Sequence, residues 1–149
     1  GEISCGSDGM SERELQESLA LLELYRAQIE GLVEQQQIVQ ASIEEHLRAK
    51  STLTGVSKAE EGAEVLVPVG GSSFVFARVS SNNKAIVGIG SGVSIEKPID
   101  EALKTIESRL QELVETFNKL AERRSALEAQ STQLTRKIQE TYQKAQGQL

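Results

Sequence analysis

The sequence predicts a mostly α-helical protein: a long antiparallel coiled-coil hairpin with a central block of four short β-strands forming two β-hairpins. Apolar residues recur at spacings of three and four over residues 11–55 and again over 98–147, a pattern typical of coiled-coil helices. Over 64–97 the apolar residues alternate in steps of two, which is typical of strands. We expect one domain over 10–149, preceded by a leader of residues 1–9 that lies outside the fold.

The first helix, over 11–55, is predicted to begin with a capping box. In this motif the Ser11 side chain accepts a hydrogen bond from the backbone N–H three residues on, and the Glu14 side chain reaches back to the N–H of Ser11. We expect it to end at Gly55, which suits a left-handed terminating position. Its two apolar columns are Leu15, Leu22, Ile29 and Ile43, and Tyr25, Leu32, Val39 and Leu53, with Leu19, Val33 and Leu47 at the side. The polar residues that interrupt the columns are Ser18, Gln36, His46 and Lys50.

The second helix, over 98–147, is predicted to carry Pro98 in its first turn, where Asp100 and Glu101 favour the positive end of the helix dipole. Its apolar spacing persists over several heptads, which indicates a left-handed coiled coil. Because the two helices have similar predicted lengths, we expect them to pair with each other. The apolar positions of the second helix are Ile99, Leu103, Ile106, Leu110, Leu113, Phe117, Leu120, Leu127, Leu134 and Ile138.

The middle segment, 64–97, is divided by turns rich in Gly, Ser and Asn, which tolerate positive φ. The predicted strands are Glu64–Val69, Ser73–Ser80, Lys84–Ile89 and Val93–Lys97. Pro68 has no backbone N–H, so it marks an edge or the end of the first strand. Both faces of the strands carry apolar residues, and such strands need partners. The expected oligomerisation residues are Val65, Leu66, Val67, Val69, Phe74, Val75, Phe76, Ile86, Val87, Ile89, Val93 and Ile95.

Composition and motifs argue against several functions. A net charge of −6 disfavours nucleic-acid binding, and no apolar run is long enough to cross a membrane. With Cys5 as the single cysteine and no secretory signal, we expect a cytoplasmic protein. We expect no metal and no cofactor, because His46 is the only histidine and the glycine run 88–92 leads into a strand rather than a helix. The chain lacks a nucleophile–base–acid set and is predicted not to be an enzyme.

Two motifs in the middle segment resemble those of the prefoldin alpha subunit of the archaeal type, which has two β-hairpins. They are residues 65–75 (Val-Leu-Val-Pro-Val-Gly-Gly-Ser-Ser-Phe-Val) and 86–93 (Ile-Val-Gly-Ile-Gly-Ser-Gly-Val). The order of helix, strands and helix matches that family from Met10 onward. The resemblance implies an ATP-independent co-chaperone that captures unfolded proteins and delivers them to a group II chaperonin. It also implies assembly of two alpha and four beta-type subunits through their strands, with a second alpha copy in each complex.

A helical hairpin places both chain ends away from the strands, where Ser18, Ser131, Thr141 and Ala145 loosen the apolar columns. Each helical hairpin forms one coiled-coil arm of the complex that the resemblance implies. We expect apolar groups near the chain ends to bind unfolded clients, weakly at each arm but with avidity over several arms. Two alternatives stay open: a structural coiled-coil scaffold, and a filament-forming prefoldin-like subunit, neither with a client-holding role. The expected client-binding residues are Met10, Leu15, Leu19, Leu22, Leu134, Ile138, Tyr142 and Leu149.

Overall fold

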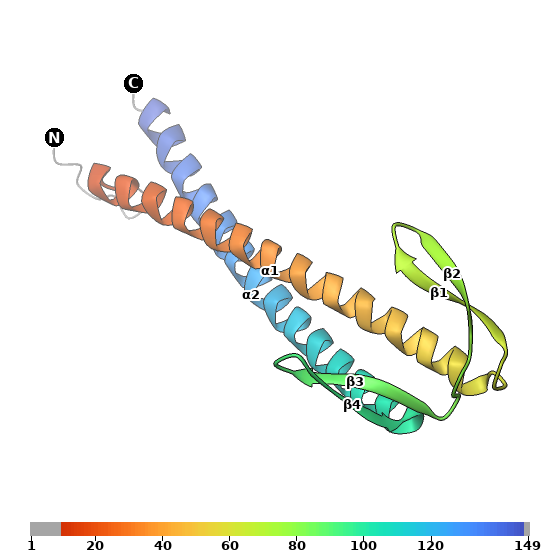
Figure 1. Cartoon of the computed structure of the whole chain (residues 1–149). Coiled ribbons are helices and arrows are strands. Elements are labelled where there is room, and N and C mark those ends of the chain that lie inside the picture. Colours follow the sequence, from red (N-terminus) through yellow and green to blue (C-terminus); the bar gives the residue numbers. More distant parts are fainter. Residues whose placement is uncertain (1–9, 148–149) are drawn as a thin grey trace. The chain divides into compact units, whose positions relative to one another are not determined.

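A computed structural model describes residues 10–147 and contains two long helices joined by two β-hairpins, in the predicted order (Figure 1). The helices are α1 (Glu12–Lys58) and α2 (Ile99–Gly147). The strands are β1 (Glu64–Gly70), β2 (Ser73–Arg78), β3 (Lys84–Gly90) and β4 (Val93–Pro98). The predicted fold class is therefore confirmed. The expected leader, residues 1–9, lies outside the described residues.

The chain forms two compact units, and each contains part of both helices. The terminal unit consists of Gly1–Ile38 and Phe117–Leu149, and the central unit is Val39–Thr116, which includes all four strands. The helices run antiparallel within each unit (Figure 1). In the central unit, Lys50 Nζ of α1 lies 3.7 Å from Glu107 Oε1 of α2, so a predicted polar interruption of the first helix has an ionic partner.

The terminal unit has a narrow core that includes a polar layer. Its buried apolar side chains are Leu22, Leu32, Leu120 and Ile138. Gln36 is also buried, and its Oε1 accepts a hydrogen bond of 3.2 Å from Nη1 of Arg124, which interrupts the apolar pattern of the opposite helix. A buried amide without a partner would cost about 1–3 kcal/mol, so the Arg124 contact offsets that penalty. Because a displaced register would separate the two side chains, this layer favours the observed helix pairing.

Both helices begin close to their predicted starts. Ser11 Oγ accepts a hydrogen bond of 3.2 Å from the backbone N–H of Glu14, as the first half of the capping box requires. Pro98 closes β4 and directly precedes α2, so its predicted place inside the first turn is wrong by one residue. Asp100 and Glu101 lie in the first turn of α2, where their charges oppose the positive end of the helix dipole.

The predicted end of the first helix at Gly55 is wrong, because α1 continues to Lys58. Gly55 has no positive φ, whereas Gly62, which follows the helix, has a φ of +82°. In the last turn Ser57 Oγ donates a hydrogen bond of 2.7 Å to the carbonyl of Thr54, which satisfies a carbonyl near the helix end. A glycine inside a helix costs only about 1 kcal/mol relative to alanine, so the helix can continue past it when the neighbouring residues favour helix.

The four strands form two separate antiparallel hairpins of the same design, β1–β2 and β3–β4. Their two-residue turns, 71–72 and 91–92, have positive φ at every position, the geometry of type I′ turns that match strand twist. Each hairpin also has a register shift just before its turn, at 68–70 and at 88–90. The prediction that the glycine run 88–92 leads into a strand is confirmed, because β4 follows the turn at 91–92.

The hairpin β3–β4 packs on α2. Val87 of β3 is only 5% exposed. Arg109 of α2 donates from Nη2 to the carbonyl oxygen of Gly88 at 2.6 Å, and Lys97 Nζ donates to Thr105 Oγ1 at 3.2 Å. The buried apolar residues of the central unit are Ile43, Val79, Val87, Ile99, Ala102 and Ile106. This hairpin is therefore fixed to its own chain through one buried side chain and two polar contacts.

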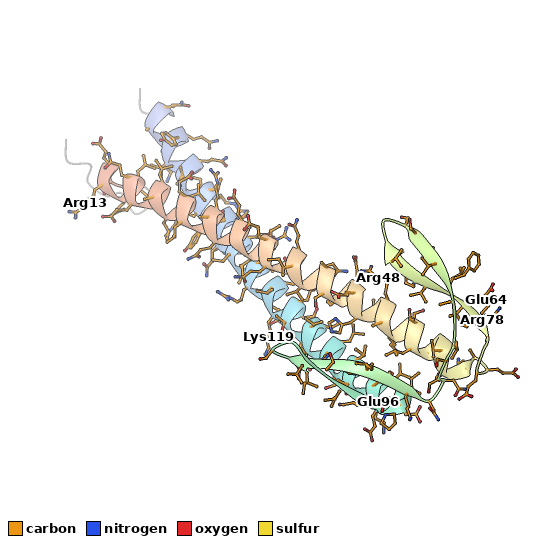
Figure 2. All side chains as sticks on the ribbon, in the orientation of Figure 1. Arg13, Arg48, Glu64, Arg78, Glu96 and Lys119 are labelled. Carbon is orange, nitrogen blue, oxygen red and sulfur yellow. The ribbon has the colours of Figure 1, made fainter. Side chains whose placement is uncertain are left out.

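The hairpin β1–β2 is attached mainly at its root. The N–H of Val79 donates to the carbonyl of Ala63 at 3.0 Å, and the N–H of Gly62 donates to the carbonyl of Val79 at 2.7 Å. Glu64 and Arg78 face each other in register at the start of the hairpin (Figure 2). No side chain of β1 or β2 is fully buried, and most of the apolar residues of this hairpin are exposed.

Substitution of Gly55 tests the corrected helix end. Gly55→Ala should raise the free energy of unfolding by about 0.5–1 kcal/mol, because alanine favours a helix interior over glycine and the added methyl group meets nothing within 4 Å. Gly62→Ala is the matched control: its space is equally open, but its positive φ should make the substitution destabilising by about 1 kcal/mol. Urea unfolding of the full chain measures both changes. A loss of stability in Gly55→Ala would contradict a helix that continues through this residue.

Candidate functional site

Large exposed apolar side chains occur on the hairpins of the central unit, along the helices of the terminal unit, and at Leu47 and Val114 on the helices of the central unit. Single exposed apolar residues are ordinary on protein surfaces, whereas contiguous groups mark interaction sites. We call the exposed apolar residues of the hairpins the strand surface: Leu66, Val69, Phe74, Val75, Phe76, Ile86, Ile89, Val93 and Ile95. Those of the terminal unit are Leu19, Leu21, Leu24, Ile38 and Tyr142.

The strand surface is most apolar on the outward face of the first hairpin. Leu66 pairs across the strands with Phe76, which is 77% exposed, and Pro68 pairs with Phe74. Full burial of one such side chain stabilises by about 1.5–3 kcal/mol, so a partner that covers this face gains several such contributions. Each two-stranded sheet also has open edges, which can pair with the strands of another chain. The outward face of the second hairpin is more mixed, because Ile86 pairs with Glu96.

The structure divides the predicted oligomerisation residues into three groups. Nine of them form the strand surface, and Val65 and Val67 are half-buried on the inward face of β1. Val87 is buried in the chain's own core, so its surface is not available to a partner in this structure. The strand pattern identified Val87 and Ile86 as residues on opposite faces. It could not tell which face the chain's own helix covers.

A groove of about 880 Å³ lies in the central unit beside the first hairpin. Phe74 and Val67 of this hairpin, Leu53 of α1, and Val87 and Ile106 line it. The two hairpins do not pair with each other. The groove therefore adds apolar surface to the strand surface and leaves space for segments of another chain.

The predicted client-binding residues have mixed positions in the terminal unit. Leu19 and Tyr142 are exposed, at 39% and 48%, and Met10, Leu15 and Leu134 are half-buried. Leu22 and Ile138 are buried at 7% and 6% exposure, so the expectation that they are available to a client is wrong for this structure. They pack in the core between the helices, as their heptad positions require. Leu149 lies outside the described residues.

Sequence reasoning missed Leu21 and Leu24, which are 39% and 51% exposed. Both lie off the two apolar columns of the first helix and were therefore passed over. The sequence signal that could have identified them is a large apolar residue at a position outside the heptad columns that form the core. Leu21 and Tyr25 form one wall of a groove of about 410 Å³, and the α2 residues between Gln130 and Glu140 form the other. We call this the terminal groove.

The single histidine has a local hydrogen-bond partner. His46 Nδ1 lies 2.7 Å from the carbonyl oxygen of Ser42, one turn earlier on α1. In the part of the chain that the structure describes, no three His, Cys, Asp or Glu residues cluster in a way that could hold a metal ion. Among the same residues, no helix combines the length and the apolar character that a membrane span needs.

Together, the two long helices and the two separate hairpins define a class of coiled-coil proteins with β-hairpins between the helices. A family model described as "Prefoldin subunit" matches residues 25–144. The chain therefore belongs to the prefoldin family, whose members are chaperone subunits rather than enzymes.

Relatives similar in sequence come from archaea. The prefoldin subunit alpha of Methanothrix thermoacetophila is 35% identical over 115 residues, which cover 77% of this chain and 75% of the relative. The prefoldin subunit alpha of Pyrococcus horikoshii is 33% identical over 135 residues, which cover 90% of this chain and 91% of the relative. Among solved structures, filamentous PFD from Methanocaldococcus jannaschii matches with a TM-score of 0.62 and 32% identity, over 78% of this chain and 96% of that chain.

A charge on the strand surface tests its predicted role in assembly. Phe76→Asp should abolish association with copies or partner subunits, because burial of an unpaired carboxylate costs several kcal/mol. Ile38→Asp is a matched control, since Ile38 is 71% exposed and lies on α1 in the terminal unit. Sedimentation at micromolar concentration should give a smaller particle for Phe76→Asp only, with helical circular dichroism unchanged. An assembly that keeps its size in Phe76→Asp would contradict the prediction.

Proposed function

We propose that this chain is the alpha-type subunit of a cytoplasmic, ATP-independent co-chaperone that holds unfolded proteins and delivers them to a group II chaperonin. Membership of the prefoldin family and similarity to prefoldin alpha subunits support this role. The observation that carries the proposal is the separation of two exposed apolar regions. The strand surface belongs to the central unit, and Leu19, Leu21, Leu24 and Tyr142 belong to the terminal unit.

In this proposal the strand surface serves assembly. It joins the chain to a second alpha copy and to beta-type subunits, in a complex of two alpha and four beta subunits. The exposed Phe74 and Phe76, the open strand edges and the central groove support this assignment. A filament is the second candidate, because the filamentous archaeal structure matches 78% of this chain with a TM-score of 0.62. Electron microscopy of the chain with and without a beta-type subunit distinguishes closed particles from filaments.

The exposed residues of the terminal unit serve client binding in the same proposal. Each half-exposed leucine can contribute about 1–2 kcal/mol when a client covers it, which makes binding by one arm weak. Several arms that bind one unfolded chain gain affinity through effective concentration. Weak separate contacts also allow the client to leave arm by arm, without a nucleotide-driven step.

The loss of two exposed leucines tests this role. The complex with Leu21→Ser and Leu24→Ser should need at least about tenfold more protein to suppress aggregation of a denatured client, because each arm formed by this chain loses more than about 1.4 kcal/mol of contact. The control carries Leu47→Ser and Val114→Ser, which remove similarly exposed apolar residues from the central unit. Light scattering without ATP measures suppression, and sedimentation confirms that both complexes assemble.

Full suppression by the Leu21→Ser and Leu24→Ser complex would contradict client binding at these residues. If the unmodified complex itself fails to suppress aggregation, the scaffold role replaces the co-chaperone role. An equal loss of aggregation suppression in both double variants would indicate that exposed apolar residues bind the client wherever they lie on the chain.

A further inference from the structure

The terminal unit has an uneven distribution of charge that the overall acidity of the chain conceals. Although the chain has a net charge of −6, residues 117–147 contain six basic and three acidic residues. Residues 12–38, which supply the opposite helix of the unit, contain two basic and six acidic residues. The α2 part of the terminal unit is therefore a basic segment within an acidic protein.

The basic residues of α2 favour one flank of the apolar columns. Residues seven apart lie on the same face of a coiled-coil helix. On one flank, positions at this spacing are occupied by Arg123, Gln130, Lys137 and Lys144. On the other flank, they are occupied by Ala121, Glu128, Thr135 and Tyr142. The first flank includes Gln130 and Lys137, which line the terminal groove, so the groove lies on the basic side of α2.

The terminal groove combines an apolar wall with a basic rim. Leu21 is 39% exposed, and Tyr25 and Leu134 are half-buried, so all three present apolar surface to the groove. Arg136 and Lys137 are exposed at its edge, and within the described residues neither forms an ion pair. A volume of about 410 Å³ is in the range of sites that bind small molecules or a few side chains.

We propose that the terminal groove binds an extended client segment in which acidic residues adjoin a large apolar side chain. The apolar side chain packs on Leu21, Tyr25 and Leu134, and the neighbouring carboxylates lie near Arg136 and Lys137. Charge complementarity selects this occupant, because the lining residues from α1 carry no charge and Glu140 is the only acidic one from α2. The inference deepens the proposed co-chaperone function and rests on it, since it names the class of client segment that one site prefers.

Peptide binding to the assembled complex of the full chain with a beta-type subunit tests this preference. The probes are two fluorescent peptides of equal length with the same Phe-Leu core, one flanked by Glu and the other by Lys. Anisotropy at low salt should give about fivefold tighter binding of the Glu-flanked peptide, the effect expected of one or two exposed ion pairs. The difference should shrink in about 0.5 M NaCl, where the Debye length is only a few ångströms.

Two charge reversals locate the preference. Lys137→Glu should abolish or invert the preference for the Glu-flanked peptide. Arg26→Glu makes the same charge change on α1 at a residue outside the groove and should preserve it. Equal affinity of the unmodified complex for both peptides, or equal effects of both reversals, would overturn the charge preference and leave client holding intact.

Further outcomes separate the groove from the proposed function as a whole. If neither peptide binds and the complex also fails to suppress aggregation, the proposed co-chaperone function is wrong as well. If Lys137→Glu changes the sedimentation of the complex without peptide, the groove is occupied by another subunit and the inference is overturned. If the Lys137→Glu complex keeps the full affinity ratio between the Glu-flanked and the Lys-flanked peptide, the inference is also overturned.

Discussion

The chain can cover only a narrow stripe of its own apolar surface, and the rest of the structure depends on this constraint. Within each unit the two paired helices bury only a narrow core, and among the described residues no large side chain is less than 2% exposed. The most enclosed core residue is the small Ala102. Even within this stripe, one layer is polar and is held by the hydrogen bond between Gln36 and Arg124. Many apolar residues outside the stripe therefore stay exposed in the single chain, and those of the hairpins are contiguous.

The hairpins carry most of the apolar surface that this constraint leaves exposed. Their type I′ turns and short ladders form from local sequence, but two-stranded sheets have marginal stability when nothing packs on them. The second hairpin gains support from Val87 and from the Arg109 contact with Gly88, whereas the first is held mainly by backbone bonds at its root. Partner strands that cover Phe74 and Phe76 would supply the missing burial. In this account, assembly completes the core of the central unit, and the terminal unit stays free for clients.

Local patterns in the sequence predicted the elements well, because helices and turns depend on neighbouring residues. Heptad spacing located both helices, and the glycine-rich turns located both hairpins to within a few residues. The errors came from tertiary context. The predicted end of the first helix at Gly55 was wrong, because the small free-energy cost of one glycine was outweighed by the helix-favouring residues around it. Val87, Leu22 and Ile138 were assigned to binding surfaces although they are buried, and Leu21 and Leu24 were overlooked although they are exposed. Periodicity shows which residues share a face, but it does not show which face is covered.

Hydrogen exchange of the assembled complex, with and without a denatured client, tests most directly the division between an assembly surface and a client surface. The account predicts that assembly with a beta-type subunit slows exchange in the strands, over 64–98. Addition of the client should then slow exchange only in the terminal unit, over 10–38 and 117–147. Client-induced protection in the strands, with none in the terminal unit, would contradict the account.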